Sequence, residues 1–276
     1  MVHPVVYHPD FKISPLKDGH SSTYVDAFIA GTISAEKMRQ IGLPWSEELV
    51  KRTLIGTGSA LLAARLALQY GVAVMCNGGT HHAHADHGTG WCIFNDLACA
   101  ARAAQRDAGV EKVLFVDLDV HQGDGTAAIF QRDPSVFTFS MHCEAQSFPS
   151  PLQTSDEDIA LPAGTSDGEY LEVLQETLPR LLSRENPDLV LYNAGVDTRA
   201  SRQRDRLVFA SCADASVPVA CAIGGGYQED HLSIVERHVL LHRAAREAMP
   251  KYSPLVLADL RSMQLTDPKK DQTEEE

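Results

Sequence analysis

The sequence predicts an α/β fold, a single domain with a mainly parallel β-sheet flanked by helices on both faces. Short apolar runs alternate along the chain with longer stretches of helical periodicity, the pattern of strands connected by helices. Several of these runs, such as V-L-F-V at 113–116, are apolar on both faces, as strands of a covered parallel sheet are. At 276 residues and 44% hydrophobic composition, the chain can bury one sizeable core.

The apolar runs are the expected strands, and the segments between them are the expected helices. One helix begins at Ser46, has acidic residues in its first turn and ends before Gly71. A second opens at Asn95 and stops at Gly109. Strands are expected at 4–7, 72–77, 113–119, 136–141, 188–194 and 217–223, and further helices at 167–184 and 231–248.

The composition argues against several classes of function and location. With 37 acidic and 24 basic residues, the net charge of −13 argues against tight binding to nucleic acid or to an anionic membrane. The six cysteines form no C-x-x-C pair, so we expect reduced thiols and a cytoplasmic protein. Neither a signal peptide nor a membrane span is expected. The domain should comprise residues 1–265, followed by a charged, disordered tail at 266–276.

Polar residues and glycines follow four of the predicted strands. Because ligands of open parallel sheets bind at the carboxyl ends of the strands, these four segments are the candidates for a functional site. Glycine there allows the backbone to approach a ligand closely. The four segments read N-G-G-T-H-H-A-H-A-D-H-G, D-L-D-V-H-Q-G-D-G, G-V-D-T and G-G-G-Y.

The D-x-D-x-H segment predicts a metal site. Residues two apart in a strand share a face, so Asp117, Asp119 and His121 are expected to point the same way. A divalent cation would offset their mutual repulsion and lost solvation, and imidazole with carboxylates suits zinc or iron. Asp197 would complete a three-ligand set with one position open for water, as in catalytic sites. The alternative is a group of solvated loop acids.

The adjacent His81 and His82 are candidates for proton transfer. A base must accept the proton of an attacking water, and an acid must protonate a leaving amine. Each imidazole needs a carboxylate on its other nitrogen, and Asp117 and Asp124 are available for this. The alternative is a surface histidine pair.

The remaining candidate features are a tyrosine, two loop histidines and a glycine-containing segment. Tyr227, after three glycines, could donate a hydrogen bond to an oxyanion, or be a packed tyrosine with a tethered hydroxyl. His84 and His87 are expected to be solvated loop residues. The segment G-T-G-S-A at 56–60 superficially suggests dinucleotide binding, but it follows no strand and should lie inside a helix.

Taken in order, these motifs resemble those of the zinc-dependent histone deacetylases, and the sequence looks most like the bacterial, class IV-like members. The resemblance runs from about Ser46 to Met249 and implies an arginase–deacetylase fold. It implies a zinc-dependent deacylase that hydrolyses the amide of acetyl-lysine, in protein or peptide, or of a related acylated amine such as a polyamine. The motifs are G-G-T-H-H-A at 78–83, G-W-C-I-F-N-D at 90–96, V-D-L-D-V-H-Q-G-D-G at 116–125, N-A-G-V-D at 193–197 and G-G-G-Y at 224–227.

The resemblance also implies roles for individual residues. Zinc would be bound by Asp119, His121 and Asp197, while Asp117 orients His81, Asp124 orients His82 and Tyr227 stabilises the oxyanion. A structural potassium would use Asp117, Asp119, His121, Ser140 and Met141, and a second monovalent site Phe130, Asp133 and Val136. The substrate tunnel would be lined by Gly90, Trp91 and Phe148, with Trp91 standing where a Phe is usual.

Two segments that relatives carry are missing, near 20–22 and 198–204, and both would shape the entrance of the site. One alternative is a catalytically impaired acyl-lysine binder or scaffold, and another is an acetylpolyamine-type amidohydrolase. A third possibility is an oligomer in which a partner chain completes the rim. An arginase-like ureohydrolase with two Mn²⁺ is a further possibility, but His81, His82 and Tyr227 argue against it.

Overall fold

The computed structural model describes residues 14–145, 147–196, 201–226 and 231–252. Within these residues, six strands form one sheet in the order β1-β6-β5-β2-β3-β4, and every neighbouring pair is parallel. The predicted α/β class with a parallel sheet is thus confirmed. The strands are β1 (Val72–Val74), β2 (Val113–Asp117), β3 (Val136–Cys143), β4 (Glu157–Leu161), β5 (Leu189–Gly195) and β6 (Val219–Gly224).

Five of the six expected strands are present, with ends that differ from the expected ones by a few residues. The sixth, at 4–7, lies outside the described residues. Strand β4 was not predicted, because its sequence E-D-I-A-L contains only three apolar residues and its positions alternate between half-buried and exposed. This is the pattern of an edge strand, and β4 is the last strand on its side of the sheet.

The four expected helices are present, and their ends follow the predicted capping signals. The Ser46 hydroxyl accepts a hydrogen bond from the Leu49 amide, and the Asn95 side chain accepts one from the Ala98 amide. The segment at 56–60 lies inside α4, as predicted. The helices are α1 (Ser14–Gly19), α2 (Ser22–Ile29), α3 (Ala35–Ile41), α4 (Glu47–Tyr70), α5 (Asp96–Ala108), α6 (Asp124–Phe130), α7 (Asp167–Glu185), α8 (Ser201–Asp214) and α9 (His231–Tyr252).

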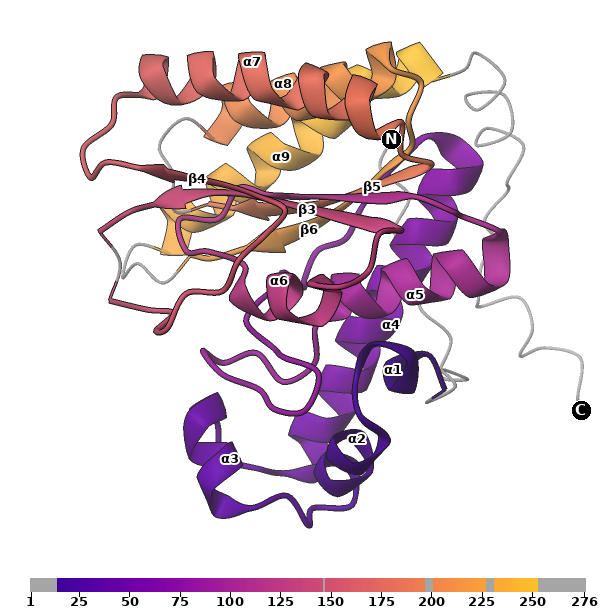
Figure 1. Cartoon of the computed structure of the whole chain (residues 1–276), viewed down its shortest axis with the longest axis vertical. Helices are drawn as coiled ribbons and strands as arrows, with labels where there is room; N and C mark the ends of the chain where they lie inside the picture. The colour runs from indigo at the N-terminus through magenta and orange to yellow at the C-terminus, as the bar shows by residue number, and fades with distance from the viewer. Residues whose placement is uncertain (1–13, 146, 197–200, 227–230, 253–276) are drawn as a thin grey trace, which may run out of the picture.

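Helices cover both faces of the sheet. Figure 1 shows α7, α8 and α9 on one side and α4, α5 and α6 on the other, with α2 and α3 beyond them. Successive residues of β2 enter opposite cores, Val113 and Phe115 on the α4–α5 side and Leu114 and Val116 on the α7–α9 side. None of the helices in the described ranges is long and apolar enough to cross a membrane.

The strand order places a topological switch point between β2 and β5. From β2 the chain moves outward through β3 to β4, and after α7 it returns to β5 and continues to β6 on the opposite side. Helices cross over on opposite faces at such a point, and the carboxyl ends of the two strands are left accessible. Asp117, at the end of β2, lies in register with Asn193 on β5 and Ser140 on β3.

The central strand should dominate the stability of the sheet. Leu114 is fully buried in the α7–α9 core, so Leu114→Ala is expected to lower the free energy of unfolding by about 2–5 kcal/mol. Leu152→Ala, at a side chain that is 52% exposed, should change it by less than about 0.5 kcal/mol. Urea denaturation measures both, and equal effects would show that β2 is not central to the core.

Candidate active site

Two buried histidines, each paired with its own carboxylate, lie in the turn after β1. His81 Nδ1 is 2.7 Å from Asp117 Oδ2, and His82 Nδ1 is 2.6 Å from Asp124 Oδ1. The two rings lie 3.9 Å apart between centroids, tilted by 44°. The structure therefore brings together the four residues that the sequence analysis grouped for proton transfer.

The turn that carries the two histidines depends on close backbone packing. Gly79 has a φ of +75°, and a Cβ there would lie 2.7 Å from the Ile223 carbonyl oxygen. The Asn95 side-chain amide donates from Nδ2 to the Ala83 carbonyl oxygen and to Thr126 Oγ1, at 3.3 and 2.9 Å. The start of α5 thus fixes the main chain just beyond His82.

The pKa values of the two histidines move in opposite directions. Burial lowers the pKa of His81, but the carboxylates of Asp117 and Asp119 outweigh burial and raise it to about 9. Burial, followed by the charge on His81, lowers the pKa of His82 to about 4 despite the bond with Asp124. The neighbouring carboxylates therefore favour a proton on His81, whereas burial and the charge on His81 favour the neutral form of His82.

Asp119 and His121 have a geometry suited to a shared metal ion. Asp119 Oδ1 lies 3.1 Å from His121 Nδ1, close to the separation of about 3.4 Å between two ligand atoms of a tetrahedral zinc. Burial raises the pKa of Asp119, but the His121 hydrogen bond and the charge on His81 lower it to about 2, so the carboxylate is ionised as a ligand must be.

The third expected zinc ligand, Asp197, lies outside the described residues, as does Tyr227. Among the residues that the structure does describe, no group of three His, Cys, Asp or Glu side chains forms a metal site. The donor pair of Asp119 and His121 fits zinc in type and spacing, and it needs one more protein ligand.

A buried cation that sequence patterns did not predict contacts the main chain next to this donor pair. Arg204, which has no exposed surface, pairs with Asp205 and donates to the carbonyl oxygens of Leu118 and Gly195. Leu118 directly precedes Asp119, so the guanidinium fixes the main chain at the ends of β2 and β5. Sequence offers little signal for this role, because an arginine at the start of a helix is usually solvated.

The residues expected to bind potassium lie around Asp117. Its Oδ1 accepts hydrogen bonds from the Asn193 side chain at 3.0 Å and from the Asp119 amide at 3.1 Å. Ser140 and Met141 are buried on the neighbouring β3, and Ser140 Oγ lies 3.0 Å from His142 Nδ1. At the second expected site, Phe130, Asp133 and Val136 are joined by two successive turns, and the Asp133 carboxylate pairs with Arg102.

Phe148 and Gly90 pack against the ring of His82. The Phe148 ring meets the His82 ring edge-on at 4.7 Å between centroids and lies 6.2 Å from the His121 ring. A Cβ on Gly90 would lie 2.5 Å from Phe148 Cζ and 3.2 Å from His82 Cδ2. These two expected tunnel residues therefore lie at the candidate centre.

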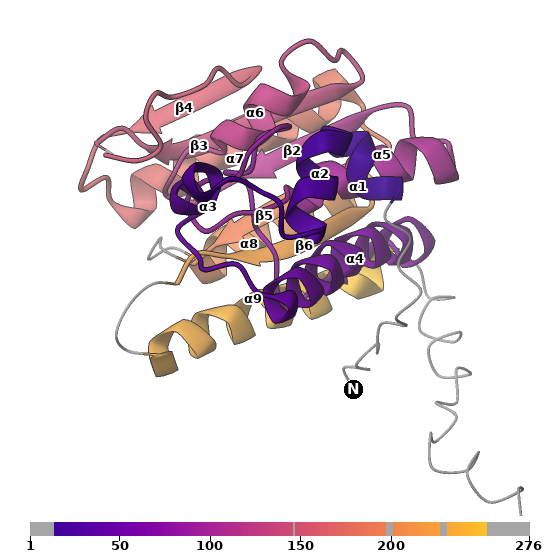
Figure 2. The same cartoon turned by 90° about the horizontal axis from the view of Figure 1, so that it is seen from below.

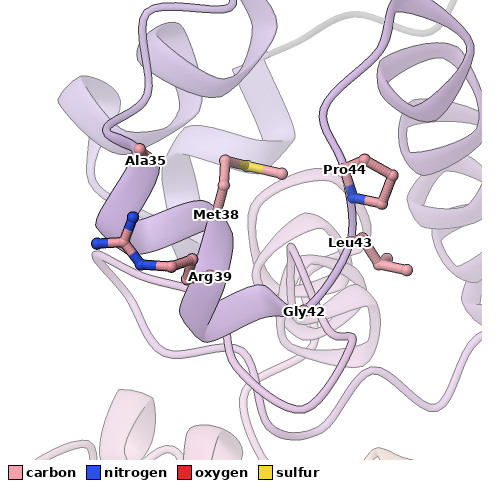
Figure 3. Close-up of a pocket in the computed structure, with 6 residues that line it drawn as sticks. All are labelled: Ala35, Met38, Arg39, Gly42, Leu43 and Pro44. Carbon is pink, nitrogen blue, oxygen red and sulfur yellow. The ribbon is translucent and has the colours of Figure 1, made fainter.

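Trp91, the third expected tunnel residue, contacts the α3 side. Its amide donates to the Ile41 carbonyl oxygen at 2.8 Å, its indole lies over Gly42, and 52% of the residue is exposed. Next to it is a shallow hollow of about 440 Å³. Figure 3 shows Met38 pointing toward Pro44 across this hollow, while Arg39 points the other way. None of the residues that line it is a candidate catalytic residue.

Substituting Gly90 tests whether the packing of Phe148 against His82 matters for turnover. Gly90 and Gly109 both have positive φ, +54° and +69°, but a Cβ at Gly109 would meet nothing within 4 Å. Both alanine variants should lose about 1–2 kcal/mol of stability from backbone strain. Only Gly90→Ala should also lower kcat/KM, by about tenfold or more, because the added methyl displaces Phe148 or His82. Equal kcat/KM values for both variants would contradict this.

The prediction that His84 is a solvated loop residue is wrong. His84 Nε2 lies 3.0 Å from Asp124 Oδ2, and its side chain is only 15% exposed. His87 stacks on it with centroids 4.4 Å apart and pairs with Asp86 at the surface. The partner of His84 is 40 residues away along the chain, so its spacing in the sequence could not reveal the contact.

Known proteins resemble this chain in sequence and in fold. A sequence model of the histone deacetylase domain matches residues 4–242. The chain belongs to the histone deacetylase family. This membership supports a hydrolase of the deacetylase type. The crystal structure of the HDA15 HD domain shares the fold, with a TM-score of 0.68 and 23% identity over 93% of this chain and 83% of that one.

Relatives in the family differ widely in length. An uncharacterised protein of Picosynechococcus is 45% identical, over 90% of this chain and 99% of its own length. Polyamine deacetylase HDAC10 of Rattus norvegicus is 37% identical, over 48% of this chain and 25% of its own length. Matches to an Arabidopsis histone deacetylase and to an archaeal probable deacetylase span 50% and 49% of those proteins.

Proposed function

We propose that this protein is a zinc-dependent deacylase that hydrolyses the amide of acetyl-lysine or a related acylated amine. The observation that carries the proposal is the buried pair of His81 and His82, each bonded to its own carboxylate, next to Asp119 and His121. Proton transfer and metal binding are thereby combined at the carboxyl end of β2, where ligands of such sheets bind. Family membership and relatives named as deacetylases support the same reaction.

The two histidines divide the proton transfers between them. His82, neutral because its pKa is low, accepts a proton at Nε2 from the attacking water as the new C–O bond forms. His81, protonated because its pKa is high, donates to the amide nitrogen as the C–N bond breaks, so that a free amine leaves. Zinc, when bound, would polarise the acyl carbonyl and lower the pKa of the attacking water toward 7.

The remaining assignments of the proposal come from the sequence. Asp197 would be the third zinc ligand, and the Tyr227 hydroxyl would donate to the oxyanion. One or two potassium ions would stabilise the strand ends around Asp117. The substrate would be an acylated lysine in a protein or peptide, or an acylated polyamine, since one relative is named a polyamine deacetylase.

The test is hydrolysis of a panel of acyl-lysine substrates, from acetyl and trifluoroacetyl to long acyl chains, together with an acetylated polyamine. Each is assayed as purified, after treatment with a chelator, and after zinc is restored. Turnover that the chelator removes and zinc restores would support the proposal, and the preferred substrate would define the class. No turnover by folded, zinc-loaded protein on any substrate would overturn it and favour a binder or scaffold.

A further inference from the structure

One carboxylate in the candidate site serves two imidazoles. Asp124 Oδ1 bonds to His82 Nδ1 at 2.6 Å, and Asp124 Oδ2 bonds to His84 Nε2 at 3.0 Å. The pKa of Asp124 is about 2, because these hydrogen bonds outweigh the effect of burial, so the carboxylate is ionised and can only accept. His84 must therefore carry its proton on Nε2 and donate it to Asp124.

The position of His84 is fixed by its own surroundings. Its amide donates to the His87 carbonyl oxygen at 2.9 Å, and its carbonyl oxygen lies 2.9 Å from His20 Nδ1. The His20 Nε2 atom in turn accepts a hydrogen bond from the Asn95 amide at the start of α5. With the His87 ring stacked 4.4 Å from its own ring, His84 has both its main chain and its side chain held in place.

Fixing the second oxygen of Asp124 has a consequence for His82. The terminal torsion of an Asp side chain is broad, so a carboxylate bonded through one oxygen can rotate about it. Hydrogen bonds to both oxygens define the plane of the carboxylate and the direction of the bond from Oδ1 to His82. A partner of this kind sets the tautomer and the orientation of a functional histidine.

We propose that His84 is a positioning residue for His82, acting through the second oxygen of Asp124. The proposal rests on the proposed role of His82 as the base, but its geometric part does not depend on turnover. His84 does not contact the substrate in this scheme. It keeps Asp124 in the orientation that holds the His82 ring in place, with Nε2 available for the proton.

Three substitutions separate this role from simple packing. His84→Phe keeps a planar ring and removes the donor, whereas His84→Gln keeps an N–H donor at similar reach. His87→Phe is the matched control, because His87 stacks on the same ring but makes no bond to Asp124. We expect His84→Phe to lower kcat by about 10–100-fold with little change in KM, and His84→Gln to recover most of that loss. His87→Phe should stay near the wild-type kcat.

A second readout does not depend on activity. In protein with ¹⁵N-labelled histidine, the proton between His82 Nδ1 and Asp124 should give a low-field NMR signal, identified by its loss in His82→Gln. We expect this signal to shift or broaden in His84→Phe and to persist in His84→Gln and His87→Phe. The proposal is overturned if His84→Phe matches His87→Phe in both readouts, or if His84→Gln is as impaired as His84→Phe. If the wild-type protein turns over no substrate, the proposed function fails while the NMR comparison still decides the role of His84.

Discussion

Replacing His82 by glutamine should lower kcat by about 10²–10⁴, the contribution of a positioned acid–base group. Glutamine removes the proton acceptor at Nε2 while keeping a polar side chain of similar size. His82 is the free base of the pair, because burial and the charge on His81 lower its pKa to about 4. The loss should appear in single-turnover measurements, which isolate bond cleavage from product release.

The matched control is His87→Phe, which keeps a ring at a half-exposed position of the same loop. It should retain wild-type kcat, and both variants should bind as much zinc as the wild type. A decrease of less than about tenfold for His82→Gln would mean that His82 is not the principal base. The role would then pass to another group in the site, with His81 the first to test.

Sequence patterns predicted the parts of this site that depend on local periodicity. Asp117 ends the buried strand β2, and Asp119 and His121 follow it in the next segment, so that their place at a strand end could be predicted from the sequence although the strand stops earlier than expected. The need of each histidine for a carboxylate, with Asp117 and Asp124 available, was also expected, and the resemblance implied which of them pairs with which histidine. The parallel sheet followed from strands that are apolar on both faces.

The parts that sequence patterns missed depend on contacts between distant segments. Arg204 is charged, and charged side chains are usually exposed, yet here its guanidinium is satisfied by Asp205 and by two carbonyl oxygens at the strand ends. His84 was predicted to be solvated because it lies in a loop. Its partner Asp124 comes close only when α6 packs beside the turn after β1. Such contacts have no period in the sequence, so local patterns cannot reveal them.

Asp119→Asn should abolish the stabilisation of the protein by zinc. A ligand that binds only the folded state at 100 times its dissociation constant stabilises it by about 2.7 kcal/mol, so added zinc should raise the Tm of the metal-free wild-type protein. In Asp119→Asn this rise should be lost and bound zinc should fall well below one per chain. The reason is that Asp119 is a buried, ionised carboxylate 3.1 Å from the other described donor, His121.

The metal-free state makes this prediction specific. Without a cation, hydrogen bonds from His121 and the charge on His81 stabilise the ionised Asp119 carboxylate and lower its pKa to about 2, so neutralising it removes favourable interactions. The metal-free Asp119→Asn protein should therefore be no more stable than the metal-free wild type, and its activity should be lost. Asp26→Asn, at an exposed carboxylate, is the control and should keep the full response to zinc. If Asp119→Asn still gained stability from zinc, the ion would be binding elsewhere, and the proposed metal centre would be wrong.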